Sequence, residues 1–478
     1  MQRNELRAIG GRQIVRALFG ACLVVLFVGA PALAAQAPPQ AGDRIQDGFK
    51  LFVVGDVIEA IPIASTIEHL SPSLVGVLKS TDVGYGNFEG TAIDWRRYRG
   101  APQAQSGGDW LISTPAVPAD LKSLGFDLVA RANNHGTDWG VGGMILTDRL
   151  LDNVGIVHAG SGVSESAARA PAFFDSAKGR VALVSVASSF VAMSRPADRR
   201  GVIPARPGVS VLDTKETVFV SPAQLAELKH VRDMLLHATG MPLPKDRSKV
   251  SFRDDTSFAF AADQKLSNGV RIHYAMDQSD LKAILLAIRQ AKETAGLVIV
   301  ALHAHQPSNY SDVPADFVPI FAHACIDAGA DVIAVSGPHR LRAIEIYKGK
   351  PVFYSLGNFV FQLVAMQPEP MDEFRVTKLN PATATDFEAL QKMRTKHFNA
   401  PIWYDSVLPI ISYRNGRAHE IKLYPLQLGF KDSAVQWGVP RLADRASGSR
   451  ILARLAQLSM VFGTTIKTSD GVGVINLQ

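Results

Sequence analysis

Short stretches rich in Asp, Asn and His follow apolar runs at six places along this chain. They lie at residues 55–56, 87–90, 133–138, 303–305, 338–339 and 355–359. Apolar strands that end in such residues are how an α/β sheet presents a site at its strand ends. The donor atoms are oxygens and imidazole nitrogens, without thiolate. This set predicts a site for a divalent metal such as Mn, Zn, Fe or Mg, and it does not suit a structural zinc site of the Cys type.

The pattern between these stretches predicts strands that alternate with helices, which is typical of an α/β sheet. Strands are expected at 51–54, 126–130, 181–186, 297–302 and 332–335, and helices at 63–70, 72–79, 143–153, 279–294 and 314–328. Hairpin turns are expected at Lys348-Gly349-Lys350 and Asn415-Gly416, and a last helix at 451–462. With 47% hydrophobic residues over 478 positions, the chain is long enough to bury a large core.

Weaker periodicity marks two insertions in the predicted domain. Between about 193 and 273, Pro, Gly, Arg and Asp dominate, and we interpret this segment as part lid and part mobile loop, with one helix at about 222–237. A second, mostly helical insertion is expected at 363–400. The main domain would then comprise residues 50–362, and strands and a helix at 401–478 would complete it.

The N-terminus has the pattern of a secretory signal peptide at 1–34, followed by a linker at 35–49. A basic segment with Arg3, Arg7, Arg12 and Arg16 precedes an apolar segment at 17–30 and the small-residue pattern Ala32-Leu33-Ala34. We therefore expect cleavage near Ala34 and a periplasmic or secreted protein without a stable membrane span. Lipidation at Cys22 is the less favoured alternative, because the most apolar residues follow this cysteine.

Charge excludes nucleic acid as an expected partner. The formal net charge is +6, and removal of four Arg and one Glu with the signal peptide leaves +3. Positive charge is concentrated locally at Arg195, Arg199, Arg200 and Arg206. Guanidinium groups pair well with carboxylate or phosphate, so this cluster suits an anionic substrate, although a solvated loop would have the same composition.

Several residues of the six stretches are candidates for metal binding or proton transfer. Asp56 follows a glycine that permits a sharp turn, so that its carboxylate could project from the strand end as a ligand or cap the next helix. In Asn133-Asn134-His135, one amide oxygen could bind metal while His135 donates a proton, and Asp138 could orient that imidazole. The same residues also favour a plain turn.

The remaining candidates come from the other stretches. His303 and His305 end an apolar run with a spacing that suits a common metal, and His339 follows another such run. Glu89 could be a ligand, a base or a salt-bridge partner. Further pocket residues are expected at Asn87, Asn133, Asn358 and, beside a glycine-rich turn, His158.

These stretches, in this order, resemble the CapA-type bacterial capsule-synthesis family, which is linked to poly-γ-glutamate. The resemblance rests on Val54-Gly55-Asp56, Asn87-Phe88-Glu89, the segment 132–140 and the long segment 344–359, and it spans about 50 to 362. It implies a relative of the calcineurin-type metallophosphoesterases and therefore a four-layer α/β/β/α sandwich. It further implies metal ligands at Asp56, Asn134, His303 and His339, a proton donor at His135 and a pocket residue at His305.

The chain departs from the pattern of those phosphoesterases at three places. Their first strand carries Asp-x-His, where this chain has Phe52-Val53-Val54, and Ser336 and Gly337 stand where the family often has another His. Gln306 replaces a frequent acidic residue. We therefore expect one or two ions.

The expected function is the synthesis, processing or export of an anionic capsule polymer such as poly-γ-glutamate, in which the protein acts as a metal-dependent hydrolase. Capsule-synthesis membrane proteins are the expected protein partners. Two alternatives remain from other classes, a non-catalytic factor that binds or exports the polymer, and a metallophosphoesterase that acts on a small phosphorylated molecule.

Overall fold

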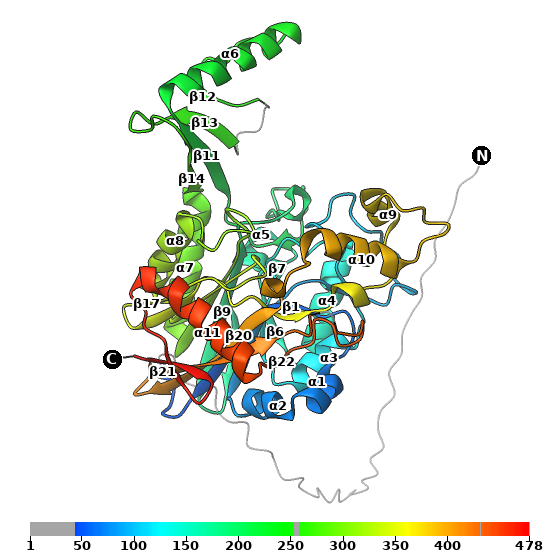
Figure 1. Cartoon of the computed structure of the whole chain (residues 1–478), viewed down its shortest axis with the longest axis vertical. Coiled ribbons are helices and arrows are strands. Elements are labelled where there is room, and N and C mark those ends of the chain that lie inside the picture. The colour runs from blue at the N-terminus through cyan, green and yellow to red at the C-terminus, as the bar shows by residue number, and fades with distance from the viewer. Residues whose placement is uncertain (1–43, 253–257, 431, 478) are drawn as a thin grey trace, which may run out of the picture. The chain divides into compact units, whose positions relative to one another are not determined.

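The computed structural model describes residues 44–252, 258–430 and 432–477. The predicted signal peptide at 1–34 and most of the predicted linker at 35–49 lie outside these residues. In the described part, two large β-sheets contain most of the strands (Figure 1). No helix among the described residues combines the length and apolar character needed to cross a bilayer.

The two sheets are both built around parallel strands. The larger sheet, with ten strands among the described residues, has the order β23 (Lys467–Ser469), β24 (Val472–Asn476), β21 (Arg417–Gln427), β20 (Asp405–Arg414), β1 (Lys50–Ile58), β2 (Val83–Phe88), β5 (Leu128–Ala130) and β6 (Val157–Ala159), with β19 (Asn358–Phe361) paired to β1 and β22 (Arg441–Leu442) to β21. The smaller sheet has the order β17 (Ile344–Tyr347), β18 (Lys350–Phe353), β16 (Val332–Ser336), β15 (Leu297–His303), β9 (Gly179–Ala187) and β8 (Ala172–Ser176). Strands β1, β2, β5, β6 and β19 are parallel to one another, as are β9, β15, β16 and β18.

Alternate residues of the central strands are buried on opposite faces of their sheet. In β1, Leu51 and Val53 belong to a core shared by both sheets, whereas Phe52 and Val54 pack with helices. In β15, Leu297, Ile299 and Ala301 likewise belong to the shared core, and Val298, Val300 and Leu302 pack with helices. Because side chains alternate along a strand, an unbroken apolar run is what a strand covered on both faces requires. The predicted α/β class is confirmed.

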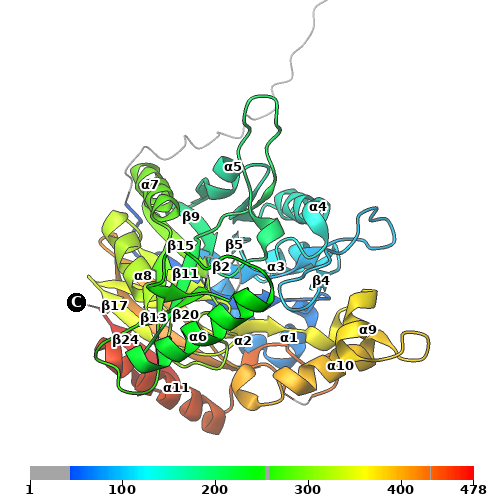
Figure 2. The ribbon, with the colours of Figure 1, turned by 90° about the horizontal axis from the view of Figure 1, so that it is seen from above.

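Helices pack on the face of each sheet that points away from the shared core (Figure 2). Against the larger sheet lie α1 (Ala64–Leu70), α2 (Pro72–Lys79), α3 (Val117–Ser123) and α4 (Gly140–Asn153), and against the smaller sheet lie α7 (Gln278–Thr294) and α8 (Phe317–Ala328). Helix α7 begins after Asp277, whose carboxylate accepts N–H groups of the first turn. Helix α8 ends at Gly329, whose φ of 121° stops the helix. Helix α11 (Arg445–Ser459) instead packs Ile451 and Leu455 into the shared core.

Both predicted hairpin turns are confirmed. Lys348 and Gly349 have φ angles of 51° and 74°, and they connect the antiparallel strands β17 and β18. Asn415 and Gly416 have φ angles of 53° and 70°, and they connect β20 and β21. Positive φ at both central residues is typical of the type I′ turn, which matches the twist of the strands that it joins.

The segment 193–273 differs from its prediction as a loop. The predicted helix is present as α6 (Pro222–Ala238), and it begins with a capping box between Ser221 and Gln224. Part of the remainder forms a separate sheet with the order β12 (Lys249–Val250), β13 (Phe258–Ala262), β11 (Thr214–Val220) and β14 (Arg271–Met276). These strands were missed because they are short and partly exposed, so that they lack a continuous apolar run. Figure 1 shows α6 on the far side of this small sheet from α8.

Candidate metal centre

The predicted site residues lie where the parallel strands of both sheets end. In the larger sheet, Asp56 of β1 is in register with Asn87 of β2 and with Asn358 of β19. In the smaller sheet, His303 at the end of β15 is in register with Ser336 at the end of β16. Because the carboxyl ends of parallel strands share one edge, side chains from distant parts of the sequence meet there.

Asp56 reaches this edge in a different way from the predicted one. We expected Gly55 to turn the chain at the end of the strand, but β1 continues through both residues to Ile58, with a register shift beside Asp56. A Cβ on Gly55 would lie 1.9 Å from the carbonyl oxygen of Gly357. That oxygen accepts the N–H of Asp56 at 3.1 Å. Glycine is needed here because another strand end approaches closely, and the expected turn and helix cap are wrong.

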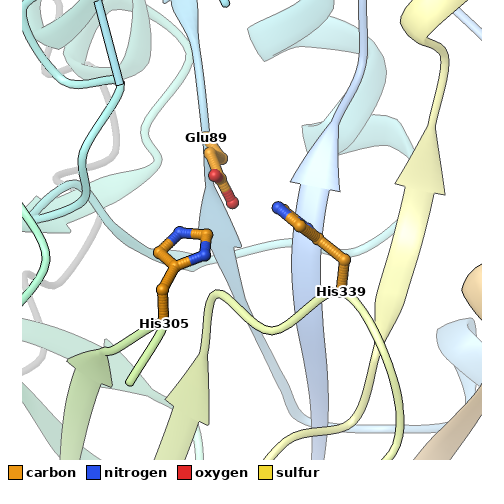
Figure 3. Close-up of side chains that lie close together, drawn as sticks. All are labelled: Glu89, His305 and His339. Atoms are coloured by element: carbon orange, nitrogen blue, oxygen red, sulfur yellow. The ribbon is translucent and has the colours of Figure 1, made fainter. Parts of the chain in front are cut away.

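Glu89, just after β2, lies between two groups of potential ligands. Its carboxylate points toward the imidazoles of His305 and His339, and the ligand atoms of these three residues lie within 4.8 Å of one another (Figure 3). Asp56, Glu89 and His303 form a second group within the same distance. Oε1 of Glu89 is buried without a hydrogen-bond partner among the described residues. These buried groups could hold a metal ion, and Glu89 is common to both.

The two carboxylates of the cluster have different environments. Asp56 accepts Nδ2–H of Asn87 at 2.9 Å and the N–H of Gly337 at 3.1 Å, and its Oδ2 lies 3.4 Å from Nδ1 of His339. Burial alone would raise the pKa of Asp56, but the hydrogen bond and charge of His339 outweigh it and lower this pKa. For Glu89, burial and the neighbouring Asp56 both raise the pKa well above its usual value. The protein therefore stabilises Asp56 as an anion and leaves Glu89 without comparable donors.

His303 and His305 face each other across the cluster. Their Nε2 atoms are 3.1 Å apart, while Nδ1 of His303 lies 2.9 Å from Oγ of Ser336 and Nδ1 of His305 lies 2.6 Å from Oδ1 of Asn309. Burial and the neighbouring imidazole lower the pKa of His303, and burial and His339 lower that of His305 to about 3. Both rings are thus kept neutral, and each is held through Nδ1 as ligand imidazoles usually are.

His135 and Asp138 form a hydrogen-bonded pair in the loop between β5 and α4. Nδ1 of His135 lies 2.7 Å from Oδ2 of Asp138, whose oxygens also accept the N–H groups of Gly107 at 3.1 Å and Leu111 at 2.9 Å. Because a carboxylate only accepts, Nδ1 carries a proton and Nε2 faces Oε1 of Glu89 at 3.8 Å. Burial lowers the pKa of His135, but the charge of Asp138 outweighs it and the pKa is raised overall.

The two asparagines before His135 have separate roles. Nδ2 of Asn133 donates to the carbonyl of Phe88 at 3.0 Å, and its Oδ1 accepts the N–H of His135 at 3.1 Å, which is a turn-stabilising pattern. Oδ1 of Asn134 instead lies 3.4 Å from Nε2 of His305, and its Nδ2 donates to Gly107. Asn133 therefore shapes the loop, and Asn134 presents its oxygen to the cluster.

His339 is held in an unusual backbone conformation. Its φ of 57° is left-handed, which is uncommon for a residue with a Cβ and is found more often at functional sites. Oδ1 of Asn358 lies 3.0 Å from Nδ1 of His339, while Nδ2 of Asn358 donates to the carbonyl of Trp403 at 3.1 Å. Asn358 thus fixes the orientation of His339 in the cluster.

Two predicted elements lie away from this cluster. His158 of β6 contacts carboxylates of α4, with Nε2 3.3 Å from Asp152 and Nδ1 3.9 Å from Asp148. In the arginine-rich loop, Arg195 pairs with Asp213 at 2.6 Å and Arg206 donates to a backbone carbonyl. Neither His158 nor any arginine of that loop lines the cavity described next.

A cavity of about 680 Å³ opens onto the cluster, and Asn134, His135, His305 and His339 line it. Its apolar wall comes largely from aromatic side chains, namely Phe190, Phe361, Phe398 and Trp403. None of the described residues of 193–273 lines it, whereas 363–400 contributes residues of α9 (Met371–Thr377) and α10 (Asp386–His397). The insertion that contributes to the lining of the cavity is therefore 363–400, and the lid expected at 193–273 stays a prediction. None of its lining residues in the described part is Lys or Arg.

Arg131 is a functional neighbour that the sequence analysis did not single out. Its side chain is fully buried, and its NH1 donates to the carbonyls of Phe88 at 3.0 Å and Gly90 at 2.7 Å, on either side of Glu89. Its Nε lies 3.3 Å from Asp148 of α4. The signal in the sequence was a charged residue directly after a buried apolar strand, where a charge needs specific partners.

Similarity to known proteins agrees with this architecture. The chain matches the family model described as bacterial capsule synthesis protein PGA_cap over residues 50–363. It is 40% identical to the uncharacterized protein y4sH of Sinorhizobium fredii over 446 residues, which are 91% of this chain and 94% of that protein. It is also 25% identical to the PGA biosynthesis protein CapA of Bacillus subtilis over 311 residues, 65% of this chain and 61% of that protein. A probable polyglutamine synthesis accessory protein of Mycobacterium tuberculosis is 29% identical over 247 residues, 51% of this chain and 47% of that protein.

Fold and site together define an α/β protein with buried carboxylate and imidazole groups, able to hold a metal ion, at the ends of parallel strands. The chain belongs to the PGA_cap family of bacterial capsule synthesis proteins. The resemblance to CapA-type proteins that the sequence motifs indicated is confirmed.

Proposed function

We propose that this protein acts on an anionic capsule polymer such as poly-γ-glutamate, in its synthesis, processing or export, as an exported metal-dependent hydrolase. Family membership supports the polymer, because a relative in Bacillus subtilis is named a PGA biosynthesis protein. The observation that carries the hydrolase proposal is Oε1 of Glu89, a buried carboxylate oxygen that has no donor in the described part of the chain and lies 3.8 Å from Nε2 of His303.

The finer architecture and location are part of this proposal. The core shared by two sheets and the helices on their other faces support the four-layer α/β/β/α sandwich of the calcineurin-type metallophosphoesterases. We assign the main domain to 50–362, with insertions at 193–273 and 363–400, and its completion to 401–478. Cleavage near Ala34 would release the protein into the periplasm or the medium, where capsule-synthesis membrane proteins are its expected partners.

The residues of the cluster fit a divalent cation. Oε1 of Glu89 has no donor in the described part of the chain, and the Nε2 atoms of His303 and His305 face each other at 3.1 Å. Asp56, Asn134 and His339 complete a set of oxygen and imidazole donors for one or two ions. Such a set favours Mn, Zn or Fe over Mg, which prefers oxygen alone. Bound there, the metal would supply Lewis acidity and lower the pKa of water.

The protein supplies the proton transfer. His135 holds a proton at Nε2 when protonated, and its raised pKa favours that form, so that it can donate to a leaving group. Asp138 keeps the ring oriented through Nδ1, and the N–H groups of Gly107 and Leu111 keep Asp138 in place. The aromatic wall of the cavity excludes water from the opposite side of the substrate.

Metal content and polymer length test this proposal together. We expect the purified protein to contain stoichiometric divalent metal, to shorten poly-γ-glutamate, and to lose this activity with chelator and regain it with metal. Asp56→Asn and His303→Ala should lose both metal and activity. His135→Gln should keep the metal and lose activity by about 10²- to 10⁴-fold. His230→Gln, on the exposed side of α6, is the control that should change neither.

Two results would favour another function. Polymer binding that persists in Asp56→Ala, without any change of chain length in the wild type, would indicate a non-catalytic polymer-binding or export factor. Turnover of a chromogenic phosphodiester that is abolished in His135→Gln, without action on the polymer, would indicate a phosphoesterase for a small envelope phosphate ester. A protein that binds no metal would contradict the proposed hydrolase.

A further inference from the structure

A second cluster of carboxylates lies beside the cavity, away from the imidazoles. Asp109 precedes β4 (Ile112–Ser113), while Glu369 precedes α9 and Glu373 lies in its first turn. One oxygen from each of the three lies within 4.8 Å of the others. Their exposed fractions are only 5%, 8% and 1%, so the three negative groups are removed from solvent together.

These carboxylates have almost no compensation from the protein. None of them forms an ion pair with a Lys, Arg or His side chain within residues 44–252, 258–430 and 432–477. Both oxygens of Glu369, Oδ2 of Asp109 and Oε1 of Glu373 are buried without a hydrogen-bond donor in the same residues. Asp109 accepts the N–H of Trp110 at 2.8 Å on Oδ1. Burial raises the pKa of Asp109 and outweighs the charge of His135 and a hydrogen bond with Glu373, which also act on it. Buried carboxylates of this kind are normally paired or bound to metal.

We propose that Asp109, Glu369 and Glu373 bind a divalent cation of the calcium type, at a site separate from the imidazole cluster. All donors here are carboxylate oxygens, the ligands that Ca²⁺ prefers, whereas the first cluster offers imidazoles. Glu369 also lines a second cavity of about 700 Å³, and Asp109 lines the first one. Ions can therefore reach the carboxylates from outside.

The charges that act on the cluster agree with an external cation. Burial raises the pKa of Glu369, and its carboxylate neighbours Asp109, Glu373, Asp386 and Asp138 raise it further. Burial and Asp109 raise the pKa of Glu373 to about 7. A divalent cation relieves this repulsion while the carboxylates stay charged, and protonation, which the raised pKa values favour, is the competing way to relieve it.

The three carboxylates come from two different segments that line the cavity. Glu369 and Glu373 belong to the insertion whose residues Val376 and Phe398 line the cavity, and Asp109 lines the same cavity from the segment before β4. Two residues after Asp109, the N–H of Leu111 donates to Asp138, the partner of His135. A cation would therefore join the insertion 363–400 to the loop that orients His135. These three carboxylates act as positioning residues and need not touch the substrate.

Terbium luminescence and thermal unfolding of the full protein test the site. Tb³⁺ replaces Ca²⁺, and Trp110, which is buried and next to Asp109 in the chain, is the indole that would sensitise its emission. We expect emission that Ca²⁺ competes away, and a Tm that rises with Ca²⁺. Glu369→Gln and Glu373→Gln should lose both effects, because each removes a charged ligand while keeping the size of the side chain. Asp372→Asn, a half-exposed neighbour in α9, should keep both.

The same measurements separate this site from the proposed catalytic metal. A His303→Ala protein should keep the Ca²⁺-dependent Tm and the terbium signal, even where its Mn²⁺ or Zn²⁺ content is lost. Retention of both signals in Glu369→Gln and Glu373→Gln would overturn the proposal. A second result would also overturn it: the wild type shows no Ca²⁺ response, and in chelator Glu369→Gln or Glu373→Gln has a higher Tm than the wild type. Protonated carboxyls would then explain the cluster.

Discussion

Removal of the Arg131 guanidinium is the sharpest test of how the fold supports the cluster. Its NH1 bonds the carbonyls of Phe88 and Gly90 at 3.0 and 2.7 Å, and its Nε lies 3.3 Å from Asp148. Arg131→Met keeps much of the apolar stem and deletes all three interactions. The buried carbonyl of Gly90 then loses this donor, and the carbonyl of Phe88 keeps only Nδ2 of Asn133. The carboxylate of Asp148, whose side chain is 14% exposed, loses its closest cation.

The size of the effect follows from these contacts. A hydrogen bond from a charged donor is worth about 1.5–3 kcal/mol, and breaking a buried ion pair costs about 3–5 kcal/mol. Because the three interactions share one guanidinium, their values do not add, and we expect Arg131→Met to lower the free energy of unfolding by about 3–5 kcal/mol. The loop that holds Glu89 should also loosen, so that metal content falls as well.

Urea unfolding in the presence of chelator measures this effect without a contribution from bound metal. Arg149→Met is the matched control, because Arg149 is exposed on α4. It should change the free energy of unfolding by no more than about 0.5 kcal/mol. Equal effects of the two substitutions would refute the reasoning, as would an Arg131→Met protein of normal stability and normal metal content.

Three other predictions follow from the contacts of the cluster. In chelator, Glu89→Gln should leave Tm unchanged or raise it, because Oε1 of Glu89 has no donor. Asp56→Asn should lower Tm, because its amide would meet N–H groups that in the wild type donate to the carboxylate. The reverse order of the two Tm values in a thermal melt would contradict this reasoning. Asp138→Asn should retain metal by elemental analysis and lose about 10²- to 10⁴-fold in polymer cleavage, and full activity would exclude the pair with His135. Gly55→Ala should give little folded protein by circular dichroism, since its Cβ would lie 1.9 Å from a carbonyl oxygen of another strand end, and a normal melt would disprove the close approach.

The sequence predicted the features that depend on local patterns. Long apolar runs such as 297–302 identify strands buried on both faces, and polar residues directly after them identify the edge at which Asn87, Asn134 and His303 meet. The type I′ turn at Asn415-Gly416 is likewise visible locally, because these two residues adopt positive φ readily.

Other features depend on contacts that no local window contains. The strand continues through Asp56 because Gly357, some three hundred positions later, accepts its N–H. Arg131 looks like an isolated charge until its carbonyl partners around Glu89 are known. Composition also does not show that α10 lines the cavity. The segments 193–273 and 363–400 both have the composition of insertions, and only the packing of the described residues shows that 363–400 contributes to the cavity.

The placement of charge connects the site to the proposed substrate. The cluster contains the carboxylates Asp56 and Glu89 and the imidazoles of His303 and His305, which burial keeps neutral, and no Lys or Arg is among the described residues that line the cavity. A divalent metal at the buried end of the cavity would supply positive charge that attracts an anion and that the neutral imidazoles do not provide. A surface rich in Lys and Arg would instead attract any polyanion in a strongly salt-dependent manner. Positive charge confined to a buried metal can be reached only by a carboxylate or phosphate on a chain slim enough to enter. Under the proposed function, the weak net charge of the protein and a preference for a slim acidic polymer would both follow from this arrangement.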